Sequence, residues 1–302
     1  MKRIAVFYNP TSGNQDKDIV IQQMKSFFLR NGFTEENLLF VQPKSPQEAF
    51  DLAKKATLEK VDMVIPLGGD GTINKICGGV YEGGGHSVIG IIPTGTINNF
   101  AKALGIPLQL EAALENLLSG ETTEFDLAKV NDTYMISSLT LGILADIAAG
   151  VTSQAKRKLG PLAYVKDAYK VIRHNKSYRI QVLHQGYTKM LKTKLLLITL
   201  TSTIAGFQVP APDVSYNDGL IRVFSLKEIH LWKLLWHLKK IRKGQFEDFT
   251  EMYHFDTNEL TIYSLSSSKR TIPFSRIDGD KSDALPLQIT VFKKALKTKI
   301  PK

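Results

Sequence analysis

The fold of this chain is decided by the stretch Met63-Val64-Ile65-Pro66-Leu67-Gly68-Gly69-Asp70-Gly71-Thr72-Ile73-Asn74. It begins as a short apolar run, typical of a buried strand, and passes directly into a glycine cluster. Glycine tolerates backbone conformations that other residues avoid and lets the backbone approach a ligand closely. We expect a helix to follow, and N–H groups at a helix start attract anions. The stretch therefore predicts a phosphate-binding turn.

Asp70 lies inside this turn and would repel a phosphate unless a cation lay between them, so it predicts magnesium. A tight strand–helix turn without any ligand is the alternative interpretation. Four of the five residues from Gly68 to Thr72 are Gly or Asp, which favours phosphate. The turn lacks the Gly-Lys-Ser/Thr of a Walker loop and the Gly-x-Gly-x-x-Gly of a dinucleotide-binding turn.

Strand and helix patterns alternate around this turn. A helix is predicted over roughly residues 16–31, ended by Gly32. Another is predicted after Ser45, which forms a capping box with Glu48 and is followed by a first-turn proline, Pro46. Such alternation predicts an α/β domain with a parallel sheet over residues 1–124. The expected strands are Arg3–Tyr8, Leu38–Val41, Met63–Leu67 and Val88–Ile92.

Beyond Glu124 the β pattern dominates, with turn signals between the runs. We expect an antiparallel, β-sandwich-like second domain over residues 125–292, and a tail at about 293–302 that packs back on the first domain. The expected strands are Phe125–Val130, Met135–Leu141, Ser177–Leu183, Lys194–Leu200, Leu220–Ser225, Leu260–Ser264 and Leu287–Phe292.

Two further strand ends carry small, polar loops, at residues 9–13 and 93–100. Ligands of open α/β sheets bind beyond the carboxyl ends of the strands. We therefore expect the three loops to converge on one crevice.

The loop sequences Asn-Pro-x-Ser-Gly, Gly-Gly-Asp-Gly-Thr and Pro-x-Gly-Thr-x-Asn, in this order, resemble those of the diacylglycerol kinase catalytic-domain family. That family includes soluble bacterial diacylglycerol kinases, sphingosine kinases and ceramide kinases. The resemblance continues through residues 211–219 and 277–280. It implies an N-terminal domain similar to those of NAD kinase and phosphofructokinase. It also implies an ATP- and Mg²⁺-dependent kinase that converts diacylglycerol to phosphatidic acid, with the nucleotide between the two domains.

The resemblance also implies roles for individual residues. Asp280 is the expected base for the lipid hydroxyl and Asp278 a supporting acid, although the family has Asp-Gly-Glu where this chain has Asp278-Gly279-Asp280. A structural magnesium ion is expected at Ser215, Asp218 and the backbone of Leu220. The expected nucleotide-binding residues are Asn9, Pro10, Thr11, Ser12, Gly13, Gly68, Gly69, Asp70, Gly71, Thr72, Thr94, Gly95, Thr96 and Asn98.

Composition limits the partners. The formal net charge of +10 indicates a polyanion, and with no nucleic-acid-recognition motif we expect an anionic membrane surface. Residues 154–160 and the amphipathic pattern 230–243 mix basic and apolar side chains, as an interfacial helix does, although ordinary packing is the favoured interpretation of 230–243. The chain has one cysteine, Cys77, which we interpret as a small buried residue, and it has no apolar run long enough to span a bilayer. These features indicate a cytoplasmic protein, which we expect at the inner face of the membrane. A homodimer is left open.

Two other functions are compatible with the glycine turn. The first is a kinase of another lipid, such as a sphingoid base or phosphatidylglycerol, or of a soluble substrate such as NAD. The Asn-Glu segment expected of an NAD kinase occurs only at Asn258-Glu259, too late in the chain. A non-catalytic lipid- or nucleotide-binding relative is the second, and Asp280 in place of glutamate makes it worth testing.

Overall fold

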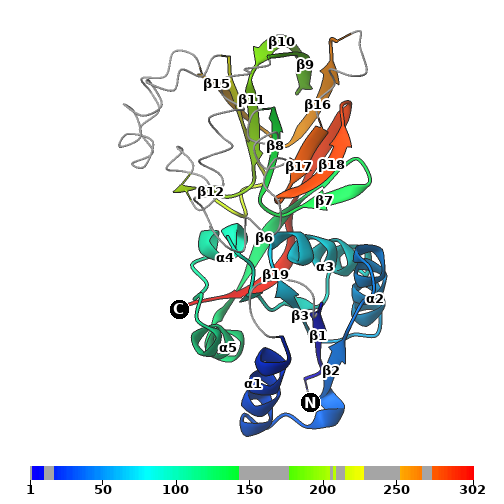
Figure 1. The fold of residues 1–302 in the computed structure, drawn as a ribbon, viewed down its shortest axis with the longest axis vertical. Helices are drawn as coiled ribbons and strands as arrows, with labels where there is room; N and C mark the ends of the chain where they lie inside the picture. The colour runs from blue at the N-terminus through cyan, green and yellow to red at the C-terminus, as the bar shows by residue number, and fades with distance from the viewer. Residues whose placement is uncertain are drawn as a thin grey trace. The chain divides into compact units, whose positions relative to one another are not determined.

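The structure is a computed structural model that describes residues 2–9, 17–142, 177–204, 207–208, 215–227, 252–266 and 274–302. These residues form two compact units (Figure 1). Unit 1 comprises residues 1–127, 216–218 and 292–302, and unit 2 comprises residues 128–215 and 219–291.

Unit 1 is built on a parallel sheet in which β1 pairs with β2 and β3, and β3 with β4 and β5. The end of β19 adds a further parallel strand beside β4. Side chains of the central strands are fully buried because helices cover both faces, which explains their uninterrupted apolar sequences. The strands are β1 (Ile4–Tyr8), β2 (Leu38–Val41), β3 (Met63–Gly68), β4 (Val88–Ile89), β5 (Ile92–Pro93) and β19 (Leu287–Ile300).

Helices α1 and α5 lie on one side of this sheet, and α2 and α3 lie on the other (Figure 1). Helix α1 buries Val20, Met24 and Phe28, which are four residues apart and so share one face. Ser45 caps α2 as predicted, since its hydroxyl accepts the N–H of Glu48 at 3.1 Å. The helices are α1 (Lys17–Arg30), α2 (Pro46–Leu58), α3 (Asp70–Glu82), α4 (Asn99–Ala103) and α5 (Leu110–Ser119), with a 3₁₀ turn, η1 (Glu35–Asn37).

Unit 2 consists of antiparallel sheets around one apolar core. One sheet has the order β15-β14-β11-β8-β17-β18, and the other contains β10-β9-β16-β19. Its strands are β7 (Thr133–Met135), β8 (Ser138–Gly142), β9 (Tyr178–His184), β10 (Tyr187–Thr193), β11 (Leu195–Thr199), β12 (Thr203–Ile204), β13 (Phe207–Gln208), β14 (Ile221–Leu226), β15 (Met252–Thr257), β16 (Glu259–Ser264), β17 (Phe274–Ile277) and β18 (Asp280–Ala284), with the ends of β6 (Glu121–Val130) and β19.

The predicted fold class is confirmed, an α/β unit with a parallel sheet and an antiparallel β unit. Several strand predictions are wrong in detail. The expected strand 88–92 is two short strands, because Gly90 interrupts it at a place where a Cβ would lie 2.8 Å from the side chain of Ile65. The expected strand 135–141 breaks at Ile136-Ser137, and β19 is far longer than 287–292. Strands β10, β12, β13, β15, β17 and β18 were not predicted.

Candidate active site

The glycine turn after β3 leads directly into α3, with Gly69 as the N-cap residue and Asp70 as the first helical residue. Gly68 is required here because a Cβ would lie 2.5 Å from the Thr72 hydroxyl oxygen. The N–H groups of Thr72 and Ile73 both donate to the Gly69 carbonyl oxygen. The first N–H groups of any helix have no intrahelical partner, so this turn offers donors to an anion.

The Asp70 carboxylate is held by the backbone of a second loop. Its two oxygens accept the N–H groups of Asn99 and Phe100 at 2.9 and 3.2 Å, at the start of α4. The buried charge is therefore compensated by backbone donors. Magnesium was inferred because this charge would repel phosphate, and that argument is weakened by the compensation found here.

The loop after β5 packs against the glycine turn. A Cβ on Gly95 would lie 2.5 Å from the Cα of Gly69, so the two backbones touch at a point where residue 95 has to be glycine. Asn98, in a left-handed conformation, closes this loop: its amide donates to the Gly95 carbonyl oxygen and its Oδ1 accepts the Gly95 N–H, both at 2.9 Å. Two of the three loops named from the sequence, those after β3 and β5, thus meet at the carboxyl ends of these strands.

Lys17, the first residue of α1, joins these loops and was not predicted from the sequence. Its ammonium group donates to the Thr94 hydroxyl oxygen at 2.6 Å, and its side chain is 2% exposed. Burial lowers the pKa of Lys17 from 10.5 to about 8. A lysine in the first turn of a helix opposes the helix dipole, and this was the available signal.

The loop after β1 is described only at Asn9, an exposed residue at the end of that strand. Pro10, Thr11, Ser12 and Gly13 lie outside the described residues. The same holds for residues 154–160, 211–214 and 230–243, which carry the expected lipid-facing segments and part of one motif.

In unit 2, Asp278 is 7% exposed and anchors a tight hairpin. Asp278 and Gly279, both with positive φ, form the two-residue turn between β17 and β18, as expected of an Asp-Gly hairpin turn. The Asp278 carboxylate accepts the backbone N–H groups of Ile136, Ser137 and Ser138, each at 2.9 Å. These bonds fix the turn to the break between β7 and β8.

Asp280 is the exposed first residue of β18, paired across the hairpin with Ile277. Within the described part of the chain, its carboxylate makes no hydrogen bond or ion pair. Arg276 supports the turn by donating from Nη1 to the Gly279 carbonyl oxygen at 2.8 Å. The arrangement is an accessible carboxylate on a rigid strand end.

The residues expected to bind a structural magnesium ion are poorly arranged for that role. The carbonyl oxygen of Leu220 accepts Nη1 of Arg222 at 3.1 Å, and Arg222 is 5% exposed. A guanidinium on this oxygen repels a divalent cation, so Ser215, Asp218 and Leu220 fit magnesium poorly and their metal role stays a prediction. The described residues contain no group of three or more His, Cys, Asp or Glu that could hold a metal ion.

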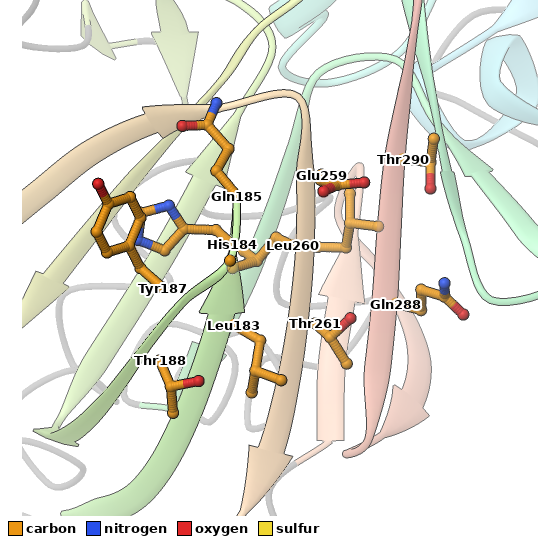
Figure 2. A pocket seen from close by; sticks show the side chains of 12 residues that line it. Leu183, His184, Gln185, Tyr187, Thr188, Glu259, Leu260, Thr261, Gln288 and Thr290 are labelled. Atoms are coloured by element: carbon orange, nitrogen blue, oxygen red, sulfur yellow. The ribbon is translucent and has the colours of Figure 1, made fainter.

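A groove of about 240 Å³ lies in unit 2 at the β9–β10 turn, lined also by β16 and β19 (Figure 2). His184 stacks on Phe255 with ring centroids 4.0 Å apart, and Glu259 lies on the groove wall. None of the catalytic, nucleotide-binding or metal-binding residues predicted from the sequence lines it.

Comparison with known proteins agrees with this geometry. Residues 3–130 match the diacylglycerol kinase catalytic domain, and residues 137–299 match the YegS C-terminal NAD kinase beta sandwich-like domain. The chain belongs to the diacylglycerol kinase family.

Relatives cover nearly the whole length of this family member. A diacylglycerol kinase of Bacillus subtilis (strain 168) is 29% identical over 287 residues, which are 95% of this chain and 92% of the relative. A diacylglycerol kinase of Staphylococcus aureus (strain MRSA252) is 26% identical over 290 residues, which are 94% of this chain and 88% of the relative.

Solved structures share the fold. A crystal structure from Bacillus anthracis str. Sterne gives a TM-score of 0.80 at 21% identity, covering 99% of this chain and 97% of that one. A crystal structure of a diacylglycerol kinase from the same organism gives 0.73 at 17% identity, with the same coverage of both chains. The family assignment makes the chain a kinase. In addition, no helix within the described ranges has the length and apolar composition to cross a membrane.

Proposed function

We propose that this chain is an ATP-dependent lipid kinase that transfers the γ-phosphate of ATP to the hydroxyl of a diacylglycerol, giving phosphatidic acid. The observation that carries the proposal is the contact of Gly69 with Gly95, where a Cβ on Gly95 would lie 2.5 Å from the Gly69 Cα. Two glycine loops that meet at the carboxyl ends of parallel strands suit a phosphate cradle. The names of the curated relatives support diacylglycerol as the acceptor.

Unit 1 binds the nucleotide in this proposal. N–H groups at the start of α3 and hydroxyl groups of the loops after β3 and β5 face the phosphates. Asp70 acts indirectly, because its carboxylate already accepts the N–H groups of Asn99 and Phe100 and so fixes one loop to the other. Asn98 closes the second loop through its two bonds to Gly95. Together these bonds hold the donors in place before ATP arrives.

Asp280 of unit 2 acts as the general base. The lipid hydroxyl oxygen forms a bond to the γ-phosphorus, the bond from that phosphorus to the β,γ-bridging oxygen breaks, and ADP leaves with the electron pair. The hydroxyl proton passes to Asp280, whose carboxylate has no partner within the described residues. Aspartate is one methylene shorter than the glutamate of the family pattern, so the hydroxyl must approach the strand end more closely.

Asp278 positions Asp280 in this proposal. Its carboxylate accepts three backbone N–H groups and so holds the turn in place. We therefore assign Asp278 the task of fixing the hairpin, in place of the supporting acid role implied by the resemblance.

Magnesium bound with ATP would supply positive charge to offset the charge of the phosphates. Asp70 is the nearest described carboxylate to the phosphate donors in sequence, and its carboxylate would hold the ion only through the loop that it fixes, by accepting the N–H groups of Asn99 and Phe100. We assign no step of the phosphate transfer to a metal ion at Ser215, Asp218 and Leu220.

The acceptor reaches the kinase from a membrane surface in this proposal, and the protein is cytoplasmic and peripheral. The net charge of +10 suits an anionic bilayer. The amphipathic segment 230–243, which lies outside the described residues, is the first candidate for contact with the lipid.

In the test, the protein is incubated with γ-phosphate-labelled ATP, magnesium and a set of acceptors in mixed micelles. Diacylglycerol, a sphingoid base and phosphatidylglycerol are the lipids, and NAD is the soluble control. Label in phosphatidic acid supports the proposal. Label only in NAD, or none in any acceptor despite ATP binding, overturns it in favour of a soluble-substrate kinase or a binding protein.

A further inference from the structure

Lys17 is a buried cation without a described anionic partner. Its side chain is 2% exposed, and its one hydrogen bond within the described residues goes to the hydroxyl of Thr94, itself 5% exposed. A lysine ammonium carries three N–H donors, so two remain for another group. No described carboxylate forms an ion pair with it.

Burying an unpaired ammonium is costly, and proteins keep such a charge where an anion compensates it. Among the described residues, the carboxylates nearest in sequence or on the neighbouring loops do not compensate this charge. Asp18 is exposed, and both oxygens of Asp70 already accept backbone N–H groups of α4. The N-terminus of α1, where Lys17 lies, adds positive potential. The site therefore favours an anion from outside the chain.

The position of Thr94 ties this cation to the glycine loops. Thr94 follows β5, in which Pro93 pairs with Gly68 of β3. The next residue, Gly95, touches the backbone of Gly69. The Lys17 ammonium is thus hydrogen-bonded to a residue of the same loop pair that forms the proposed cradle.

We propose that Lys17 binds a phosphate group of the nucleotide and that Thr94 orients its ammonium toward that phosphate. The inference that the anion is a phosphate of ATP rests on the proposed function, whereas the existence of an anion site at Lys17 does not. Backbone N–H groups and hydroxyls of the loops are neutral donors, so Lys17 supplies the full positive charge that a polyphosphate requires.

Binding of pyrophosphate, ADP and adenosine to the full-length chain tests this site by calorimetry. Lys17→Met removes the charge and keeps the length of the side chain. Lys25→Met is the matched control, because Lys25 lies on the same helix, is 42% exposed and pairs with Glu35. We expect Lys17→Met to weaken pyrophosphate and ADP binding at least tenfold and to leave adenosine binding unchanged. Lys25→Met should leave all three unchanged.

Equal pyrophosphate affinities in the wild type and a folded Lys17→Met variant would overturn the proposal, as would a wild type that binds no pyrophosphate. If the variant does not fold, an NMR measurement on the wild type still tests the proposal. The lysine with the lowest pKa in a ¹⁵N NMR titration should show a higher pKa once pyrophosphate is added, and an unchanged value contradicts the proposal. Pyrophosphate binding through Lys17 without phosphate transfer to any lipid overturns only the proposed reaction.

Discussion

The carboxylate of Asp278 lies 2.9 Å from the backbone nitrogen of Ser138, although 140 residues separate them in the sequence. The same carboxylate accepts the N–H groups of Ile136 and Ser137. Strand β7 ends and β8 begins at these residues. One side chain therefore joins the β17–β18 turn, which carries Asp280, to the break between two other strands.

Asp278→Asn should destabilise the protein, because an amide nitrogen cannot accept the N–H group that one carboxylate oxygen now accepts. The loss should be about 3 kcal/mol, since hydrogen bonds to a charged group contribute about 1.5–3 kcal/mol each. Urea unfolding of the full-length chain measures it. Asp280→Asn is the control and should change stability by less than about 0.5 kcal/mol, as expected for an exposed side chain. Equal stabilities of the two variants would contradict the anchoring role.

The contact between the two glycine loops predicts an asymmetric pair of alanine variants. A Cβ on Gly95 would lie 2.5 Å from the Gly69 Cα, whereas a Cβ on Gly69 would meet its nearest atom at 3.4 Å. Gly95→Ala should therefore cost about 1–3 kcal/mol by overpacking, and Gly69→Ala much less. Thermal unfolding compares the two. A neutral Gly95→Ala would show that the loops do not touch.

The low pKa of Lys17 predicts how stability and anion binding change with pH. Its value is about 8 in the folded chain and 10.5 when exposed. Between these pH values the unfolded chain holds a proton that the folded chain has lost, so the Lys17 contribution to stability rises with pH. Pyrophosphate binding should weaken above about pH 8, as the ammonium loses its proton. In Lys17→Met both trends should be reduced, and an identical pH profile would contradict them.

Much of unit 1 was predictable because its signals are local. The apolar run before Gly68, the Ser45 cap and the glycine turn each depend on neighbours in sequence. The break between β7 and β8 was not predictable, since it is made by Asp278, more than 100 residues away. The interruption at Gly90 depends on contact with Ile65 and Leu117, which only the packed sheet and helix bring together.

The candidate site likewise contains residues that the sequence predicts and residues that it does not. The glycine loops were found from their sequences, and Asp280 from the family resemblance. Lys17 was missed because its burial depends on Thr94, 77 residues later in the chain. The role of Asp70 was interpreted from its charge alone, while its partners Asn99 and Phe100 come from a loop 29 and 30 residues away.

The central claim is that Asp280 takes the proton of a lipid hydroxyl as ATP phosphorylates it, and transfer of labelled γ-phosphate into extracted lipid tests it most directly. Wild type should label phosphatidic acid. Asp280→Asn should lower kcat by about 10²–10⁴-fold with little change in the KM for ATP, because general-base catalysis typically contributes this much. Asp283→Asn, an exposed aspartate on the same strand, should keep wild-type activity. Full activity of Asp280→Asn, or no labelled lipid with wild type, would contradict the account.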